Sequence, residues 1–400
     1  MHGSYKGPLH GIPVGIKDNI ETKGIRTTAG SKILADFIPD KTATAVEKVL
    51  GAGCILLGKQ NTHEFAAGTT NINPFYGPSR NSWNTNHMTG GSSGGSAAAL
   101  AAGLGTLAIG TDTIGSIRIP SAMCGTYGLK PSYGLVSLFG SIPTAWSMDY
   151  LGPMVRSVTD LALILNNMAG YDPKDPASMQ VRASNYMEDL NKGIAGIKIG
   201  IPTYYLENLD SDVETLFNHA VATLQELGAE IREINIPELS MSTFSGLATM
   251  SGEAAAFHYK WLQTRPEEYG ADIRAFLEAG VLSSPAQYLT AQQARRKMVK
   301  AFHKAFQDVD VLVGPTIPIT APEFQENWVE QNSEVESHAV PFTAPTNLTG
   351  TPNVSVPMGL CSKGLPAGMQ FIGDNFCEKQ LLQVGAAWER TNPLRFTVNS

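Results

Sequence analysis

The chain has few cysteines, no excess of positive charge and no long apolar run, and each absence excludes a class of protein. Four cysteines are scattered over 400 residues without CxxC spacing, which argues against a zinc ribbon or a disulfide framework and suits a reducing compartment. The net charge of -7 provides no basic surface for nucleic acid. The longest apolar stretch, residues 97–109, contains glycines and is too short to span a bilayer. We therefore expect a cytoplasmic protein that binds neither nucleic acid nor membranes.

The usual metal and nucleotide motifs are missing as well. His63 opens the segment HEFAA, which lacks the second histidine of a HExxH zinc site, and the remaining histidines are isolated. The glycine-rich residues 89–100 lack the lysine of a phosphate-binding P-loop, and their spacing does not fit GxGxxG. We expect no metal and no organic cofactor.

Short apolar strands alternate with helical patterns along the chain. Residues 198–202 predict a strand, Ser211 marks the start of an amphipathic helix that Gly228 ends, and residues 229–237 alternate like a second strand. Further strands, cut off by Gly and Pro, are predicted within the segments DVDVLVGPTIP, PNVSVPMG and PAGMQFIG. This order is typical of an α/β fold.

Neither a low-complexity linker nor a repeat divides the chain, so we predict a single domain over residues 1–400. Residues 243–306 are helix-rich and could form a cap over the sheet.

The stretch TGGSSGGSAAAL, residues 89–100, looks like a flexible linker. A small-residue helix and an apolar strand follow it directly, so both of its ends are anchored in packed structure. Its glycines permit unusual backbone angles, while Ser92 and Ser93 supply hydroxyl groups. Ser116 lies in a second glycine-containing turn, just beyond a strand end, where sites in α/β folds collect.

A serine nucleophile needs a base, and no histidine here has motif support. Lys17 follows apolar residues in GIPVGIKDNI, and a lysine made neutral by burial can act as a base. Taken alone, Lys17 fits a surface lysine beside Asp18 better.

Several segments together resemble the amidase signature family. They are GPLHGIPVGIKDNI, HEFAAGTT, TGGSSGGSAAALAAGL, GTDTIGSIRIPSAMCGTYGLKPSYGLVS, SMDYLGPMVRSVTD and NLTGTPNVSVPMG with GLPAGMQFIG, and they cover essentially the whole chain. The resemblance implies a large mixed, twisted β-sheet covered by α-helices. It also implies a Ser-Ser-Lys triad in which Ser116 is the nucleophile, Ser92 the bridging serine on a cis peptide bond, and Lys17 the base.

The same resemblance implies supporting roles for neighbouring residues. The backbone N–H groups of residues 113–116, that is Thr113, Ile114, Gly115 and Ser116, are predicted to form the oxyanion hole. Asp112 and Arg118 are expected to hold this loop in shape, and Ser93 and Ser96 are assigned to loop hydrogen bonding.

Two features depart from the family pattern. Ile114 stands where the family motif TDTGGSIR has a glycine, so this position either uses an ordinary backbone angle or reshapes the oxyanion hole, and its side chain could narrow the pocket. Family members also usually carry a helical segment before the lysine strand, whereas Lys17 comes almost at once here. The loss of those helices could expose apolar surface, which allows a homo-oligomer.

The leading hypothesis is an amidase that hydrolyses a small-molecule amide to an acid and ammonia or an amine, through an acyl-enzyme on Ser116. Alternatives are a hydrolase of carbamates or aryl acylamides, and the glutaminase-type subunit of a tRNA-dependent amidotransferase. Against the last, SHAVPFTAPTNLTG lacks the acidic residue expected to hold an amino acid's ammonium group. A silent scaffold subunit is the non-enzymatic alternative. We expect the pocket walls to include residues 139–146 and the helix-rich middle.

Overall fold

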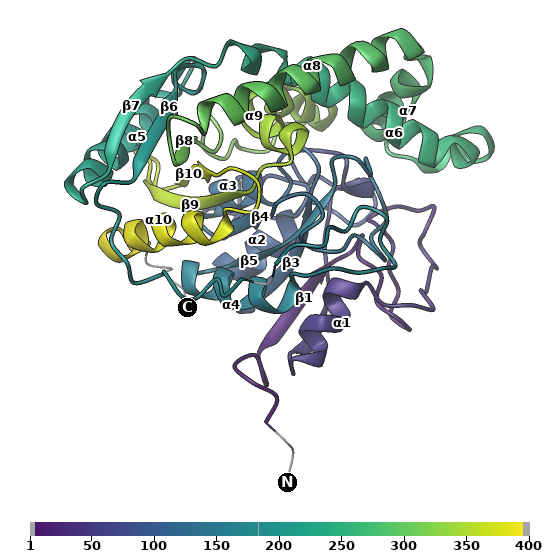
Figure 1. Cartoon of the computed structure of the whole chain (residues 1–400). Helices are drawn as coiled ribbons and strands as arrows, with labels where there is room; N and C mark the ends of the chain where they lie inside the picture. Colours follow the sequence, from purple (N-terminus) through teal and green to yellow (C-terminus); the bar gives the residue numbers. More distant parts are fainter. Residues whose placement is uncertain (1–4, 183, 395–400) are drawn as a thin grey trace.

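The computed structural model of the chain describes residues 5–182 and 184–394. Its centre is a ten-stranded sheet in the order β2-β1-β3-β5-β4-β9-β10-β8-β6-β7 (Figure 1). The strands are β1 (Pro13–Lys17), β2 (Ile55–Gln60), β3 (Leu107–Asp112), β4 (Tyr127–Lys130), β5 (Tyr150–Val155), β6 (Lys198–Pro202), β7 (Glu230–Ile234), β8 (Val311–Pro315), β9 (Asn353–Leu360) and β10 (Pro366–Ile372).

The sheet is mixed, with parallel pairing at both edges and antiparallel pairing between them. Strands β2, β1 and β3 are parallel neighbours, as are β8, β6 and β7. All pairs from β3 through β5, β4, β9 and β10 to β8 are antiparallel. This confirms the predicted large mixed α/β sheet.

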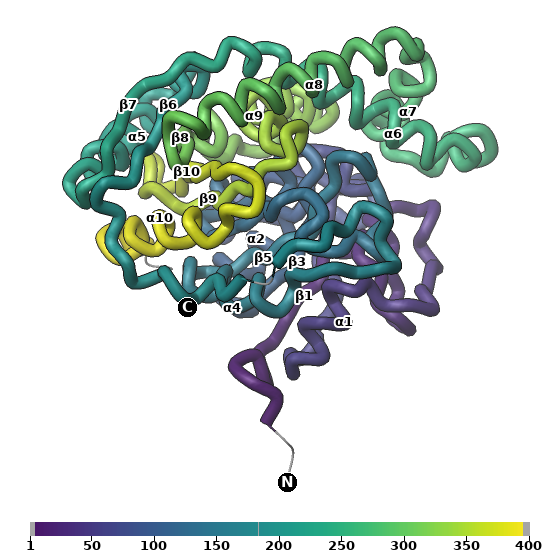
Figure 2. The backbone as a smooth tube through the Cα atoms, in the orientation of Figure 1, coloured from purple at the N-terminus to yellow at the C-terminus, as the bar shows by residue number. Residues whose placement is uncertain are grey.

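Helices cover both faces of the sheet (Figures 1 and 2). Along β3, Leu107 and Ile109 pack in the core shared with α1, α4, α5 and α10, whereas Ala108 packs with α2 and α3, because successive strand residues face opposite sides. The helices are α1 (Thr44–Gly51), α2 (Gly94–Ala101), α3 (Arg118–Cys124), α4 (Val158–Met168), α5 (Ser211–Glu226), α6 (Ser242–Thr264), α7 (Ala271–Leu282), α8 (Pro285–Ala305), α9 (Trp328–Thr349) and α10 (Glu378–Thr391).

The predicted helix-rich segment, residues 243–306, is confirmed as α6, α7 and α8, which project together beside α9 (Figure 2). Helix α8 begins with a capping box in which Ser284 and Gln287 satisfy each other's backbone N–H groups. These helices share a second apolar core with Ile114, so they lie against the loop that carries Ser116.

The strand, helix and strand predicted over residues 198–237 are confirmed as β6, α5 and β7. One detail differs, because Asp210 caps α5 where Ser211 was expected. The Asp210 carboxylate accepts the N–H of Asp212 at 3.3 Å, and a carboxylate also interacts favourably with the helix dipole. Gly228 follows the helix with a φ of 90°, as the predicted stop signal requires.

All four cysteines are free, and Cys54, Cys124 and Cys361 are buried. Within residues 5–182 and 184–394, none of the helices has the combination of length and apolarity needed to cross a membrane.

Candidate active site

The glycine-serine stretch is packed inside the protein. Residues 89–94 are all buried, and Gly90 has a φ of 69°. A Cβ atom on Gly91 would lie 2.7 Å from the backbone nitrogen of Asn71 and 2.9 Å from the carbonyl oxygen of Gly68. Only glycine allows so close an approach of two backbones. The stretch is therefore a tightly held loop, and the interpretation as a linker is excluded.

Lys17 is the last residue of β1, and its side chain is fully buried next to β3. Its Nζ atom donates to Ser92 Oγ at 2.7 Å and to Thr111 Oγ1 at 2.7 Å. Asn19 Nδ2 donates to the same Thr111 hydroxyl at 3.2 Å. The interpretation of Lys17 as a surface lysine is therefore wrong.

Burial changes the acid–base behaviour of this lysine. It lowers the pKa of Lys17 from 10.5 to about 7, although the negative charges of Asp112 and Asp149 oppose the shift. A lysine with this pKa is neutral in a large fraction of molecules near pH 7, and its nitrogen can then accept a proton.

Ser92 and Ser116 are held by adjoining loops. The Gly91–Ser92 peptide bond is cis, as the family resemblance implied. The N–H of Ser93 donates to the carbonyl oxygen of Ser116 at 3.1 Å, and Ser93 Oγ donates to that of Thr111 at 3.2 Å. Ser96 Oγ donates to Gln60 at 2.7 Å. Lys17 and Ser92 thus touch directly, while backbone contacts tie Ser116 to the same loop.

Asp112 and Arg118 form a buried ion pair behind the Ser116 loop. Both side chains are fully buried, and Arg118 donates twice to the carboxylate, from Nε at 2.9 Å and from Nη2 at 2.9 Å. Asn347 adds a hydrogen bond at 2.9 Å. Burial alone would raise the pKa of Asp112, but Arg118 and Asn347 outweigh it and lower the pKa. Asp112 is therefore ionised, and its remaining lone pairs are free to organise the loop.

The same carboxylate fixes the backbone of the loop. It accepts the N–H of Gly115 at 2.8 Å and the N–H of Ile117 at 3.1 Å. The Gly115 N–H was predicted to serve the oxyanion hole, but it points at Asp112 and is not free to bind an oxyanion here. Gly115 has a φ of 131°, whereas Ile114 is absent from the described residues with positive φ. The isoleucine therefore fits this loop with an ordinary backbone angle.

Asp149 supports the loop from a position to which sequence analysis gave no role. Its buried carboxylate accepts the Thr113 hydroxyl at 2.6 Å and the N–H of Thr144 at 2.9 Å. Burial raises the pKa of Asp149 to about 7, against the opposing effect of these hydrogen bonds. A charged residue directly before the buried strand β5 was the signal that could have identified it.

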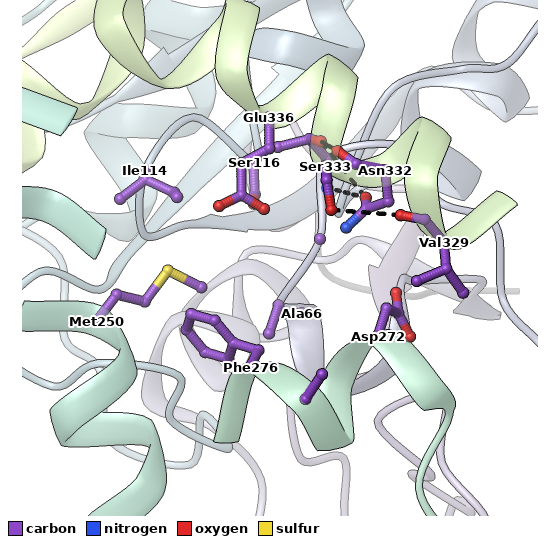
Figure 3. A pocket seen from close by; sticks show the side chains of 14 residues that line it. Ala66, Ile114, Ser116, Met250, Asp272, Phe276, Val329, Asn332, Ser333 and Glu336 are labelled. Carbon is purple, nitrogen blue, oxygen red and sulfur yellow. Dashed lines mark hydrogen bonds between the residues drawn. The ribbon is translucent and has the colours of Figure 1, made fainter. Parts of the chain in front are cut away.

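A cavity of about 230 Å³ opens at Ser116 (Figure 3). Ile114 lies beside the serine, as predicted, and Met250 of α6 and Phe276 of α7 add apolar surface. The helix-rich middle therefore contributes walls, as expected. Residues 139–146 were expected here too, but they are not among the lining residues. Phe139 and Trp146 line a different cavity of about 330 Å³.

Two carboxylates line the cavity at Ser116, and sequence analysis assigned neither. Asp272 comes from α7 and Glu336 from α9. The Asp272 carboxylate is 2.8 Å from His63 Nε2. None of the described lining residues is Lys, Arg or His. The cavity therefore combines an apolar belt with two carboxylates. The segment SHAVPFTAPTNLTG lacks an acidic residue, but both carboxylates reach the cavity from outside that segment.

Comparisons with known proteins match the chain over nearly its whole length. Residues 1–382 match the family described as Amidase. The chain is 41% identical over 408 residues to a glutamyl-tRNA(Gln) amidotransferase subunit of Geobacter sp. (strain M21), covering 96% of this chain and 84% of that protein.

Two solved structures share the fold. The first belongs to work on a vestigial protein complex and the evolutionary origins of an s-triazine catabolic enzyme, with a TM-score of 0.91, 34% identity and coverage of 98% of this chain and 86% of that one. The second is a bacterial aryl acylamidase of the amidase signature family, with a TM-score of 0.88, 29% identity and coverage of 97% and 84%. The chain belongs to the amidase signature family.

Proposed function

We propose that this protein is an amidohydrolase that cleaves the C–N bond of a small carboxylic amide by means of Lys17, Ser92 and Ser116. The observation that carries the proposal is the 2.7 Å hydrogen bond between Lys17 Nζ and Ser92 Oγ inside a fully buried pair. A buried lysine with a pKa of about 7 is suited to accept a proton from a hydroxyl.

In the proposed reaction, Ser116 Oγ attacks the amide carbonyl carbon while its proton passes to Ser92, whose own proton passes to neutral Lys17. The tetrahedral intermediate collapses as the relay runs backwards and protonates the leaving nitrogen. Ammonia or an amine departs and leaves an ester on Ser116. Water then attacks this ester with the same relay as base, which releases the acid and restores the serine.

The negative oxygen of the intermediate needs hydrogen-bond donors. Because Asp112 holds the Gly115 N–H, the N–H groups of Thr113, Ile114 and Ser116 remain as candidates. The Asp149 and Asp112 contacts to this loop support such a role, because donors fixed before the reaction stabilise an oxyanion without reorganisation.

The test is ammonia release from a panel of aliphatic, aromatic and amino-acid amides, with Ser116→Ala and Lys17→Ala beside the parent protein. The proposal expects turnover of at least one amide and a loss of about 10²-fold or more in each variant. Lys198→Ala is the matched control, because that lysine is an exposed residue at the start of β6. Turnover that persists in Ser116→Ala would reject the proposed nucleophile.

A second candidate is the glutaminase-type subunit of a tRNA-dependent amidotransferase, which would require protein partners. The 41% identity to a glutamyl-tRNA(Gln) amidotransferase subunit favours it. The cavity argues the other way, because no described lining residue offers a positive charge to the α-carboxylate of glutamine. Glutamine tested beside simple amides distinguishes the two candidates.

A further inference from the structure

The walls of the cavity at Ser116 carry two carboxylates, of which Asp272 contacts His63 Nε2 at 2.8 Å. Asp272 and Glu336 line it, and no described Lys, Arg or His does. Figure 3 shows Glu336 on α9 and Asp272 on α7, two different helices that border the pocket. An anionic substrate would meet repulsion here, whereas a cation would find two carboxylates.

Glu336 is the carboxylate that can still accept hydrogen bonds. It is partly buried, and among the residues that the structure describes no donor forms a hydrogen bond or ion pair with its carboxylate. A partly buried carboxylate without a donor is costly, because it has lost water without gaining a partner. A ligand that donates hydrogen bonds would supply what the protein does not.

Nearby carboxylates increase this cost. Burial raises the pKa of Glu336 to about 7, and Asp272 adds to the shift while His63 opposes it. Behind the cavity wall, Glu64 accepts the N–H of Gly270 at 2.7 Å. Burial, and to a smaller extent the charge of Asp272, raise the pKa of Glu64 to about 7 as well. A positive charge in the cavity would offset the repulsion that Asp272 exerts on each of the two glutamates.

We propose that the substrate is a small amide whose acyl chain ends in an ammonium group, with the amide at Ser116 and the ammonium held by Glu336 and Asp272. This inference rests on the proposed function, since it names the substrate class of the same site. The apolar belt that includes Met250 and Phe276 would contact the methylene groups between the two polar ends. The carboxylates thereby select substrates with a positive charge, and Ser116 attacks the amide carbonyl.

The experiment compares three amides of nearly equal length at pH 8: aminopentanoic acid amide with a terminal ammonium, hexanamide with a methyl group in its place, and adipic acid monoamide with a carboxylate. A charge-assisted hydrogen bond predicts kcat/KM for the ammonium amide about tenfold or more above that of hexanamide, and the lowest value for the monoamide. Glu336→Gln is expected to reduce the preference about tenfold. Glu334→Gln is the control, since Glu334 is exposed on the same helix and does not line the cavity.

A binding measurement separates this inference from the proposed function. Calorimetry with the Ser116→Ala variant is expected to show tighter binding of the ammonium amide than of hexanamide, and loss of that difference when Glu336→Gln is added. A binding preference without turnover in the parent protein would reject the amidase proposal and retain the cation site. Turnover of hexanamide equal to that of the ammonium amide, or a preference unchanged by Glu336→Gln, would overturn the inference.

Discussion

Lys17 Nζ lies 2.7 Å from Ser92 Oγ, although the two residues are 75 positions apart in the chain. Lys17 lies on strand β1, between β2 and β3. Ser92 lies in the buried loop before α2. Neither side chain is exposed to solvent. The fold therefore keeps an amine and a hydroxyl in contact away from water, where proton transfer between them is not in competition with bulk solvent.

The pH dependence of activity should report the state of Lys17. Because burial lowers its pKa to about 7, the lysine is protonated below this pH and cannot act as a base. We expect kcat/KM to rise about tenfold per pH unit below pH 7 and to level off above it. Rates for a neutral amide between pH 5 and 9 provide the measurement. A flat profile across pH 7 would mean that a lysine of this pKa is not the base.

Asp112→Asn should destabilise the fold, because it leaves the Arg118 guanidinium buried without its counter-charge. Breaking a buried pair in this way costs about 3–5 kcal/mol of the free energy of unfolding. Urea denaturation measures the loss. Glu47→Gln serves as the control, since Glu47 pairs with Lys174 at the surface with both side chains about half exposed, and such pairs contribute about 1 kcal/mol or less. Equal effects of the two substitutions would contradict a stabilising role for the buried pair.

Gly115→Ala should impair both stability and activity. The new Cβ would lie 2.7 Å from Ile119 Cδ1 and 2.7 Å from Thr343 Oγ1, at a φ of 131°. Such backbone strain costs about 1–3 kcal/mol and would displace the Ser116 loop. Gly193→Ala offers a comparison, because nothing lies within 4 Å of that position. Thermal unfolding and amide turnover are the two readouts, and a fully active Gly115→Ala protein would refute a rigid loop.

Ile114→Ala should widen the range of substrates. The isoleucine lines the cavity beside Ser116 and is only 5% exposed, so its removal enlarges the space next to the reacting carbonyl. We expect kcat/KM for aryl amides to increase relative to that for short aliphatic amides. The same ratio measured for Ile38→Ala, a change at an exposed residue outside the cavity, should stay constant. A ratio that does not move in Ile114→Ala would show that this side chain does not limit substrate size.

The sequence predicted those parts of the site that lie within continuous motifs. The segments around Lys17, Ser92 and Ser116 each carry a local signal, namely a lysine in an apolar strand or a serine among glycines. Asp272 and Glu336 carry no such signal, because each lies on a helix that carries other acidic residues as well. Tertiary packing of α7 and α9 brings them to Ser116. Hydrophobic periodicity and motif spacing in the sequence do not predict that packing.

The role of Asp112 was anticipated in outline and misjudged in detail. Asp112 and Arg118 were expected to hold the loop in shape, and they form a buried ion pair behind it. The sequence could not show that the carboxylate also accepts the Gly115 N–H, since backbone direction within a loop depends on its full three-dimensional path. The expectation that residues 139–146 line the cavity at Ser116 was wrong for the same reason. The path of the chain places Phe139 and Trp146 at a different cavity.

The most direct test of the central claim is to trap the acyl-enzyme. The protein is mixed with an amide that it hydrolyses, quenched in acid within the first turnovers, and analysed by mass spectrometry of its peptides. We expect an acyl group on Ser116 in the parent protein and no adduct in Ser116→Ala. An acyl group on another residue, or adduct formation that persists in Ser116→Ala, would contradict the assignment of Ser116 as the nucleophile.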